Sequence, residues 1–251
     1  MSPQAIATPL RTARIPSLRQ RISETELLDA PGHDPGLLRD NLRDIRRVNT
    51  LVGGTAGIIR HLPALVDSIP LSKTITILDL ATGSADIPLA ISRWADQTGR
   101  SVEICASDVS SDILAIAREH TSADPAISLA QLDARDVPAP DRSFDIVLCS
   151  LALHHFSPND AVMVLREMDR LAARGFILND LRRSCAGYLA TKVASLLMTR
   201  NPLTHHDAPL SIQRAYSPAE LLWLLHHADV PDARLFTAPW FRMIAVRDKC
   251  S

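Results

Sequence analysis

Acidic side chains stand at three places where the sequence predicts that a buried strand ends. Asp79 lies at the end of the apolar run 74–80, and a loop of small residues, 81–86, follows that run. Asp108 and Asp133 come at the ends of the next two apolar runs. In an open α/β sheet, ligands bind outside the carboxyl ends of the strands, so we expect these three carboxylates to border one site.

The chemistry of these positions favours a ligand that is cationic or rich in hydroxyl groups. Gly83 can adopt a positive φ, and the small residues around it let the backbone approach a ligand closely. A carboxylate such as Asp108 can accept hydrogen bonds from both hydroxyls of a ribose. The loop has one glycine where the dinucleotide pattern GxGxxG has three, and it has an acid at each end. These residues therefore predict a pocket for an adenosine with a positively charged tail.

The elements that position these side chains alternate between strand and helix. Short apolar runs favour strands, and each is separated from the next by a stretch with helical or loop character. The predicted strands are residues 74–80, 101–107, 126–132, 144–150, 175–180, 233–239 and 241–247. This alternation predicts an α/β fold with a doubly wound, mostly parallel sheet of seven strands. The last two strands are expected to form a hairpin at one edge.

The chain divides into a tail, a helical cap and a main domain. Residues 1–22 are rich in proline and arginine and show no periodicity, which predicts a flexible tail. Residues 23–70 favour an N-terminal helical cap, in which a Ser23–Glu26 capping box starts a first helix. A second helix should begin at Asp34-Pro35, where an aspartate cap precedes a proline. The main domain is then expected over residues 71–251.

Residues 182–215 interrupt the alternation and are expected to form a helical lid insertion. Residues 186–198 favour a helix, whereas residues 199–210 are polar and broken by prolines. An insertion of this size before the last helix is where a lid would be placed. Because the proline-rich stretch offers few apolar anchors, we expect it to be mobile when no ligand is bound.

Composition excludes several classes of protein. The chain has 251 residues, 46% of them apolar, and a formal net charge of −1, so it carries no overall attraction for a nucleic acid. No apolar run is long enough to span a membrane, and the N-terminus has no signal-peptide core. The cysteines are widely spaced and fit neither a disulfide framework nor a metal knuckle. We therefore expect a cytoplasmic protein without a metal centre.

Three segments in order resemble a known family. ILDLATGSADI, ASDVS and LDARDVPAPDRSFDIVLCSLALHHF are similar to motifs of the class I S-adenosylmethionine-dependent methyltransferases. The loop ATGSAD looks most like that of the ubiquinone/menaquinone-biosynthesis C-methyltransferases and their small-molecule relatives. The resemblance covers residues 73–181. It implies a Rossmann-like fold and S-adenosyl-L-methionine as the cofactor.

The resemblance also assigns cofactor-binding roles. It places the methionine end of the cofactor beside the first loop, the ribose on the acid after the second strand, the adenine between the second and third strand ends, and the methyl beside the fourth. The residues implied are Asp79, Ala81, Gly83, Asp108, Val109, Asp133, Ala134, Ser150 and Leu151. Ala81 and Ala85 depart from the family, because they replace the outer glycines of its usual loop.

Three histidines are candidates for a base or for a group that orients the methyl acceptor. His154 and His155 follow the fourth strand, and His206 lies in the insertion. Their side chains could instead be packed or solvated without a role, and neighbours in the chain point in different directions. Asp79 and Asp86 likewise have a simpler alternative, in which they cap the following helix.

The leading hypothesis is a methyltransferase of secondary metabolism that acts on a small, fairly hydrophobic acceptor. O- or C-methylation of a phenol, a quinone or a polyketide-like acid fits the resemblance. The alternative is a catalytically silent methyltransferase fold that serves as a cofactor-binding scaffold or partner subunit. An oxidoreductase should show GxGxxG, and a nucleic-acid adenine methyltransferase should show an Asn/Asp-Pro-Pro-aromatic element where residues 150–153 read Ser-Leu-Ala-Leu. A homodimer is compatible with either hypothesis.

Overall fold

A computed structural model describes residues 18–249 of the chain, so most of the expected tail and Cys250 lie outside it. The elements follow one another along the chain as η1 (Leu27–Asp29), α1 (Pro35–Leu51), α2 (Gly54–Val66), β1 (Ile75–Leu80), α3 (Asp86–Thr98), β2 (Val102–Asp108), α4 (Ser111–Thr121), β3 (Ile127–Gln131), β4 (Phe144–Ser150), η2 (Leu153–His155), α5 (Pro158–Leu171), β5 (Ala172–Leu181), α6 (Cys185–Met198), α7 (Pro202–Arg214), α8 (Pro218–His227), β6 (Arg234–Ala238) and β7 (Arg242–Asp248). Among these described elements, no helix is long and apolar enough to cross a membrane.

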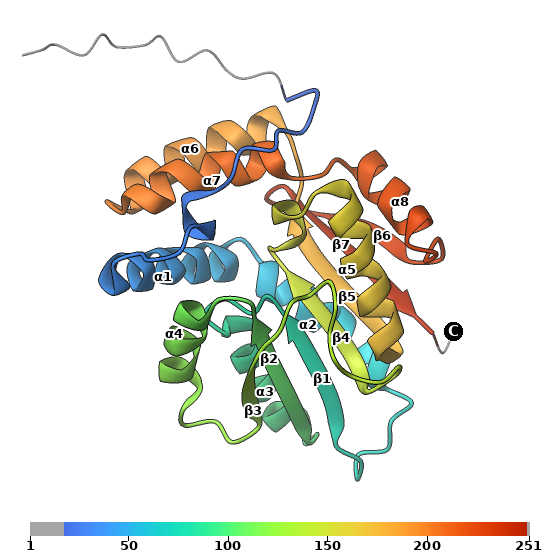
Figure 1. The fold of residues 1–251 in the computed structure, drawn as a ribbon. Coiled ribbons are helices and arrows are strands. Elements are labelled where there is room, and N and C mark those ends of the chain that lie inside the picture. The colour runs from blue at the N-terminus through green and yellow to red at the C-terminus, as the bar shows by residue number, and fades with distance from the viewer. Residues whose placement is uncertain (1–17, 250–251) are drawn as a thin grey trace, which may run out of the picture.

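The strands form one sheet in the order β3-β2-β1-β4-β5-β7-β6. Strands β1 to β5 run parallel, and β7 runs antiparallel to both of its neighbours. The predicted mostly parallel sheet and its terminal hairpin are therefore confirmed (Figure 1). The register pairs Leu80 with Ser107 and with Cys149, so the carboxyl ends of the three central strands lie side by side.

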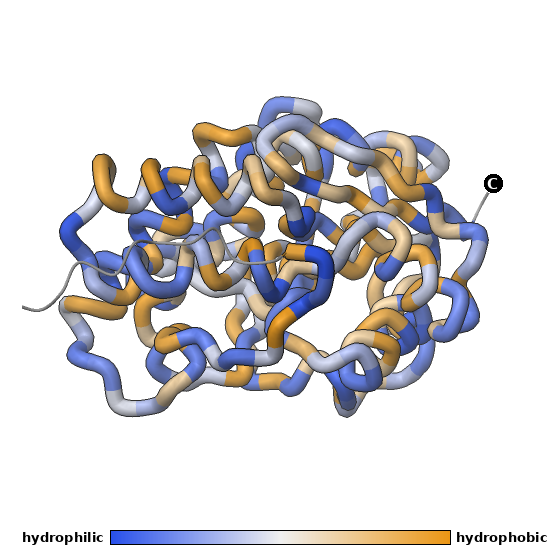
Figure 2. Tube along the Cα trace, turned by 90° about the horizontal axis from the view of Figure 1, so that it is seen from above, coloured by the Kyte–Doolittle hydropathy of each residue, from blue (hydrophilic) through white to orange (hydrophobic). Residues whose placement is uncertain are grey.

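Helices cover both faces of the sheet and bury two apolar cores. Helices α2 and α3 pack on one face around Ile58, Leu62 and Ile91. Helices α5 and α8 pack on the other face, and their core includes Leu165 and Leu224. Figure 2 shows apolar and polar residues alternating along the helices, which is the pattern of helices that pack one face against a sheet. Both faces of the central strands are thereby buried, as expected for a parallel sheet.

The first predicted helix is wrong, because the chain at Glu26 forms only the short turn η1. Glu26 precedes η1 and its side chain makes no capping bond. The carboxylate is buried instead, 4% exposed, and faces His154 and Arg214. The glutamate of the apparent capping box is thus used in a long-range cluster. The helix predicted at Asp34-Pro35 is confirmed, since Asp34 accepts a hydrogen bond from the backbone N–H of Leu37 at 2.9 Å.

The proline-rich stretch after residue 198 was expected to be a loop and is instead the helix α7. Pro202 stands in the first turn, where its missing N–H costs nothing, and Asn201 caps the N-terminus. Leu203, Leu210 and Ile212 are buried, so the helix has the apolar anchors that the sequence pattern did not reveal. The expectation that this stretch is mobile rested on a lack of apolar anchors, and the buried leucines and isoleucine of α7 contradict that basis.

The last residues of the predicted flexible tail are fixed against the rest of the protein. Arg21 donates hydrogen bonds to the carbonyl oxygens of His154, at 2.6 Å, and of Phe156, at 2.8 Å. Its guanidinium also lies 4.6 Å from the centre of the Tyr216 ring. The chain from residue 21 to η1 therefore runs across the molecule between α7 and α1 (Figure 1). We call residues 21–34 the N-terminal segment.

Candidate functional site

A cavity of about 770 Å³ opens at the carboxyl ends of the central strands. Its walls come from the loops after β1, β2 and β4, from α1 and α7, and from the N-terminal segment. The lining includes seven of the predicted cofactor residues and two of the predicted histidines: Asp79, Ala81, Gly83, Asp108, Val109, Ser150, Leu151, His154 and His155. The structure thus brings together side chains that the sequence places far apart.

The loop after β1 turns sharply and presents its backbone to the cavity. Ala81, Gly83 and Ala85 all have positive φ, between 55° and 59°. This conformation suits glycine best, so the two alanines carry a strain that the surrounding structure must hold. A Cβ atom added to Gly83 would have no protein atom within 4 Å, so this position faces open space. The loop is therefore shaped for the close approach of a ligand.

Asp79 is a buried carboxyl group with an unused acceptor atom. One oxygen accepts the Thr82 hydroxyl at 2.6 Å, whereas Oδ1 is buried without a hydrogen-bond partner among the described residues. Burial raises the pKa of Asp79 to about 7, and the neighbouring acids Asp86 and Asp108 add to the shift. A cationic group of a ligand beside Oδ1 would relieve both the missing bond and the desolvation of the charge.

Asp108 connects the ends of β1 and β2. Its two carboxylate oxygens accept hydrogen bonds from the backbone N–H groups of Gly83, at 3.2 Å, and Ser110, at 3.0 Å. Burial raises the pKa of Asp108, although these backbone donors oppose the shift. Each carboxylate oxygen has a second lone pair, so the group can still accept bonds from two ligand hydroxyls.

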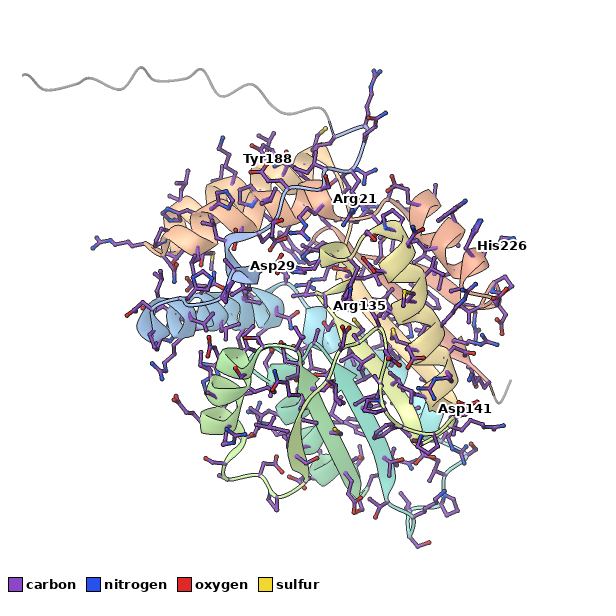
Figure 3. All side chains as sticks on the ribbon, in the orientation of Figure 1. Arg21, Asp29, Arg135, Asp141, Tyr188 and His226 are labelled. Atoms are coloured by element: carbon purple, nitrogen blue, oxygen red, sulfur yellow. The ribbon has the colours of Figure 1, made fainter. Side chains whose placement is uncertain are left out.

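Asp133 and Ala134 do not line the cavity, in contrast to the other residues implied by the resemblance. Asp133 forms an ion pair with Arg135, with 2.6 Å between Oδ2 and Nη2. Gln131 and Arg135 reach the cavity from this strand end in their place. Asp29, from the N-terminal segment, lines the same cavity as Arg135, and both are labelled in Figure 3. The sequence alone did not indicate that Asp133 would pair with Arg135, because aspartate is common in loops.

Ser150 and Leu151 continue the wall beyond β4. The Ser150 hydroxyl accepts a hydrogen bond from the Asn179 side chain at 2.9 Å, and the Leu151 N–H donates to the Asn179 carbonyl at 2.8 Å. Leu151 also has a positive φ of 56°. The end of β5 therefore holds the turn after β4 in place.

His154 is oriented by a carboxylate that the sequence analysis did not select. Its Nδ1 lies 2.6 Å from Asp180 Oδ1, and its backbone N–H donates to Asp180 Oδ2 at 2.9 Å. Both side chains are buried. Burial alone would raise the pKa of Asp180, but the charge and hydrogen bond of His154 outweigh it, and the pKa is lowered. Asp180 ends β5, so the signal used for the first three strands could have found it.

His155 stands beside His154 and contacts the N-terminal segment. Its Nδ1 lies 2.8 Å from Asp29 Oδ1, and its Nε2 lies 3.8 Å from Glu26 Oε2. Burial would lower the pKa of His155, but Glu26 and Asp29 outweigh it, so the pKa is raised. The two imidazole rings lie 4.4 Å apart and face the two oxygens of Glu26.

Folding also supplies a third potential metal ligand that sequence spacing does not show. One ligand atom each from Glu26, His154 and His155 lies within 4.8 Å of the others. Arg214 already approaches this cluster, with its Nε 3.8 Å from Glu26 Oε1. The positive charge of Arg214 therefore lies beside Glu26 and would repel a metal ion bound there.

His206, the third predicted histidine, does not line the cavity. It lies on α7, 40% exposed, with its Nδ1 2.7 Å from Asp207 Oδ1. Thr204, Ala208 and Ser211 are the residues of this helix that reach the cavity. Asp207 instead accepts hydrogen bonds from the backbone of η1 and so fixes the N-terminal segment.

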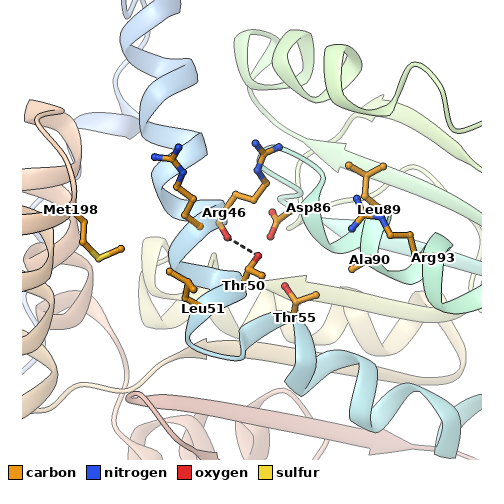
Figure 4. Close-up of a pocket in the computed structure, with 10 residues that line it drawn as sticks. Arg46, Thr50, Leu51, Thr55, Asp86, Leu89, Ala90, Arg93 and Met198 are labelled. Atoms are coloured by element: carbon orange, nitrogen blue, oxygen red, sulfur yellow. Dashed lines mark hydrogen bonds between the residues drawn. The ribbon is translucent and has the colours of Figure 1, made fainter.

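A second hollow of about 610 Å³ lies on the other side of α1, between this helix, α3 and the end of α6 (Figure 4). Arg46, Arg47 and Arg93 surround an apolar floor that includes Leu89 and Met198. None of the predicted site residues lines it, and it shares only Asp86 with the larger cavity. The predicted site and the second hollow are therefore distinct.

Comparison with known sequences identifies the central part of the chain. Residues 77–175 match a family model described as "Methyltransferase domain". A demethylmenaquinone methyltransferase of Staphylococcus carnosus is 32% identical over 111 residues, which cover 44% of each chain. The ubiquinone/menaquinone biosynthesis C-methyltransferase UbiE of Chromobacterium violaceum is 31% identical over 124 residues, or 49% of this chain and 48% of that one. The matched region thus spans about half the length of these relatives.

Solved structures extend the likeness of fold to most of the chain. The CurJ carbon methyltransferase superposes with a TM-score of 0.65 at 12% identity, over 87% of this chain and 62% of that one. A SAM-dependent methyltransferase from Aquifex aeolicus gives a TM-score of 0.58 at 15% identity, over 86% and 98% of the two chains. At these identities the likeness concerns the fold alone.

Proposed function

We propose that this chain is a class I S-adenosylmethionine-dependent methyltransferase that methylates a small acceptor bound in the cavity, since residues 77–175 match a methyltransferase domain. The proposed reaction is O- or C-methylation of a phenol, a quinone or a polyketide-like acid. The names of the curated relatives support a quinone-related acceptor, since they refer to demethylmenaquinone and to ubiquinone and menaquinone biosynthesis.

The first half of the cavity fits the cofactor. Open space at Gly83 accommodates a ligand against the backbone, and the unpartnered Oδ1 of Asp79 can accept a bond from the methionine ammonium. Asp108 would hold the ribose hydroxyls, and Val109, which is 65% exposed, would flank the adenine. Ser150 and Leu151 would then border the sulfonium. When bound, this cofactor supplies a methyl group on a good leaving group.

The second half of the cavity carries the observation on which the proposal mainly rests, the pair His154–Asp180. With its Nδ1–H donated to Asp180, a neutral His154 directs the lone pair of Nε2 towards Glu26. The gap of 3.7 Å between Nε2 and Glu26 Oε1 is too long for a hydrogen bond. A hydroxyl group of the acceptor that lies beside Nε2 could give its proton to this nitrogen as the oxygen or the activated carbon is methylated.

His155 and Glu26 would complete the acceptor site. The raised pKa of His155 favours its protonated form, which would stabilise negative charge that develops on the acceptor oxygen. The Oε1 of Glu26 makes no hydrogen bond among the described residues and lies 3.7 Å from Nε2, so its negative charge would stabilise the imidazolium that His154 forms. In this arrangement His154 is the base, and Asp180 orients it and stabilises its charged form.

The roof of the cavity supports a fairly hydrophobic acceptor. Apolar side chains of α1 and of the N-terminal segment line the side opposite the strands, namely Leu28, Leu38, Leu42, Ile45 and Val48. We propose that α1, α7 and the N-terminal segment together act as the lid, so that the acceptor is enclosed and water is excluded from the reacting pair.

Transfer of labelled methyl groups from S-adenosylmethionine to a panel of phenols, hydroxyquinones and polyketide-like acids tests the proposal. We expect methyl uptake by at least one of these acceptors. His154→Gln should lower turnover by about 10²-fold or more, the usual contribution of a general base, while affinity for S-adenosylhomocysteine is retained. Uptake by no member of the panel would count against this acceptor class. Normal turnover by His154→Gln would exclude His154 as the base.

A further inference from the structure

One wall of the cavity contains a buried arginine with two nitrogen atoms that make no hydrogen bond to the described residues. Arg242, the first residue of β7, is 2% exposed and lines the cavity. Its Nε and Nη1 atoms have no hydrogen-bond partner within the part of the chain that the structure describes. Burial lowers the pKa of this guanidinium to about 10, and the charges of Asp180 and Asp86 only partly compensate. A cation in this state has high potential affinity for an anion.

The two nearest acids are already engaged elsewhere. Asp180 is bonded to His154, at 2.6 Å, and Asp86 accepts the side-chain amide of Asn49 at 2.8 Å. Neither carboxylate lies within ion-pair distance of Arg242. Asp180 and Asp86 therefore both attract the guanidinium of Arg242, but neither forms an ion pair with it.

Gly54, at the start of α2, leaves room for the side chain of Arg242. A Cβ atom on Gly54 would lie 1.9 Å from Asn49 Oδ1 and 2.8 Å from Arg242 Cζ. The absence of a side chain at the start of α2 therefore lets Asn49 and Arg242 pack together at the cavity wall. Asn49 Oδ1 is itself buried without a partner. Two donor atoms of Arg242 thus lack partners at this place in the cavity wall, which is rare in a folded protein unless a ligand completes them. The Oδ1 of Asn49 is an acceptor and offers no bond to an anion.

We propose that Arg242 binds a carboxylate group of a ligand in this cavity. The planar guanidinium binds a carboxylate through two parallel hydrogen bonds, whereas a phosphate-sized dianion would be repelled by the nearby Asp86 and Asp180. The inference rests on the proposed function, since it concerns a ligand of the same cavity. It adds to that function a residue, Arg242, that recognises a carboxylate on one of the two ligands.

Two ligands could bring this carboxylate, because Arg242 lies between the two halves of the cavity. Asp86, which attracts Arg242, also acts on Asp79 near the end of β1. Asp180, on its other side, orients the proposed base. The carboxylate therefore belongs either to the amino-acid end of the cofactor or to the acceptor, which would then be an aromatic or polyketide-like acid.

Binding measured by calorimetry on the full chain tests the site with two matched pairs of probes. The first pair is S-adenosylhomocysteine and its decarboxylated analogue. The second pair is salicylate and phenol, each added with S-adenosylhomocysteine present. Each pair is titrated into the wild type, Arg242→Met, Arg242→Lys and the control Arg93→Met, whose exposed arginine lines only the second hollow.

We expect the wild type to prefer the carboxylated member of at least one pair. Arg242→Met should weaken binding of that member by about 10- to 100-fold and leave the other member unchanged. Arg242→Lys should fall between, because it keeps the charge without the planar fork, and it provides the comparison if the methionine variant does not fold. Arg93→Met should match the wild type. A response in the first pair assigns the carboxylate to the cofactor, and a response in the second assigns it to the acceptor.

The proposal is overturned if no carboxylate preference in either pair depends on Arg242. Failure of the wild type to bind S-adenosylhomocysteine at all would instead refute the proposed function. Tight binding of S-adenosylhomocysteine that is indifferent to Arg242, together with the same indifference for salicylate, would refute this inference alone.

Discussion

Replacement of Asp108 tests cofactor binding, and a second measurement on the same variants tests folding. Asp108→Ala removes both carboxylate oxygens that are proposed to hold the ribose, and it removes the acceptors of the Gly83 and Ser110 N–H groups. Asp108→Asn keeps one oxygen. The matched control is Asp141→Ala, whose carboxylate is exposed and lies far from the cavity rim (Figure 3).

The magnitudes follow from the environment of the carboxylate. Loss of hydrogen bonds to a charged group costs about 1.5–3 kcal/mol, so Asp108→Ala should weaken binding of S-adenosylhomocysteine by about 10- to 150-fold. Asp108→Asn should cost less. Burial raises the pKa of Asp108, which means that the unliganded fold holds its charged form at a cost. The free energy of unfolding of Asp108→Asn should therefore lie within about 1 kcal/mol of that of the wild type, or above it.

Calorimetric titration and denaturant unfolding of the same preparations provide the two readouts. Weak binding with unchanged stability is the expected outcome for Asp108→Asn, and Asp141→Ala should change neither. If Asp108→Ala binds S-adenosylhomocysteine as tightly as the wild type, the ribose does not lie on this carboxylate. The assignment of the first half of the cavity would then be wrong.

Three further predictions concern other residues of the site. Because the pKa of Asp79 is raised to about 7, its protonation should weaken binding of S-adenosylhomocysteine as the pH falls from about 8 to about 6. Asp79→Asn should abolish this pH dependence, and titrations across that range measure it. Gly83→Val places a branched side chain at a φ of 58° and into open cavity space, so it should lose binding, as measured by calorimetry, and normal affinity would contradict the placement of the loop. His206→Ala should turn over within about twofold of the wild type in the methyl-uptake assay, since His206 does not line the cavity, and a large loss would return it to the catalytic candidates.

The sheet and the first loop could be predicted because their signals are local. Strands such as β1 are short apolar runs between clear breaks, and the acids Asp79 and Asp108 end them. Rules for connections in α/β proteins then place these ends together without any knowledge of side-chain contacts. The same logic would have found Asp180 at the end of β5, had the fifth strand been treated like the first three.

The residues that the sequence did not reveal depend on contacts between distant segments. Glu26 matched a local capping pattern, but its burial beside His154 yields a different use of the same side chain. The prolines in α7 suggested a loop, although one stands in the first turn and the helix is held by tertiary packing. Arg242 appears in an ordinary strand pattern, and only the fold shows that its Nε and Nη1 have no hydrogen-bond partner among the described residues.

A crystal structure of the complex with S-adenosylhomocysteine tests the central claim most directly. We expect the ribose hydroxyls on Asp108, the amino-acid end beside Asp79, and the sulfur on the side of the cavity that holds His154. Ligand bound elsewhere, for example in the hollow around Arg93, or with its ribose away from Asp108, would contradict the account.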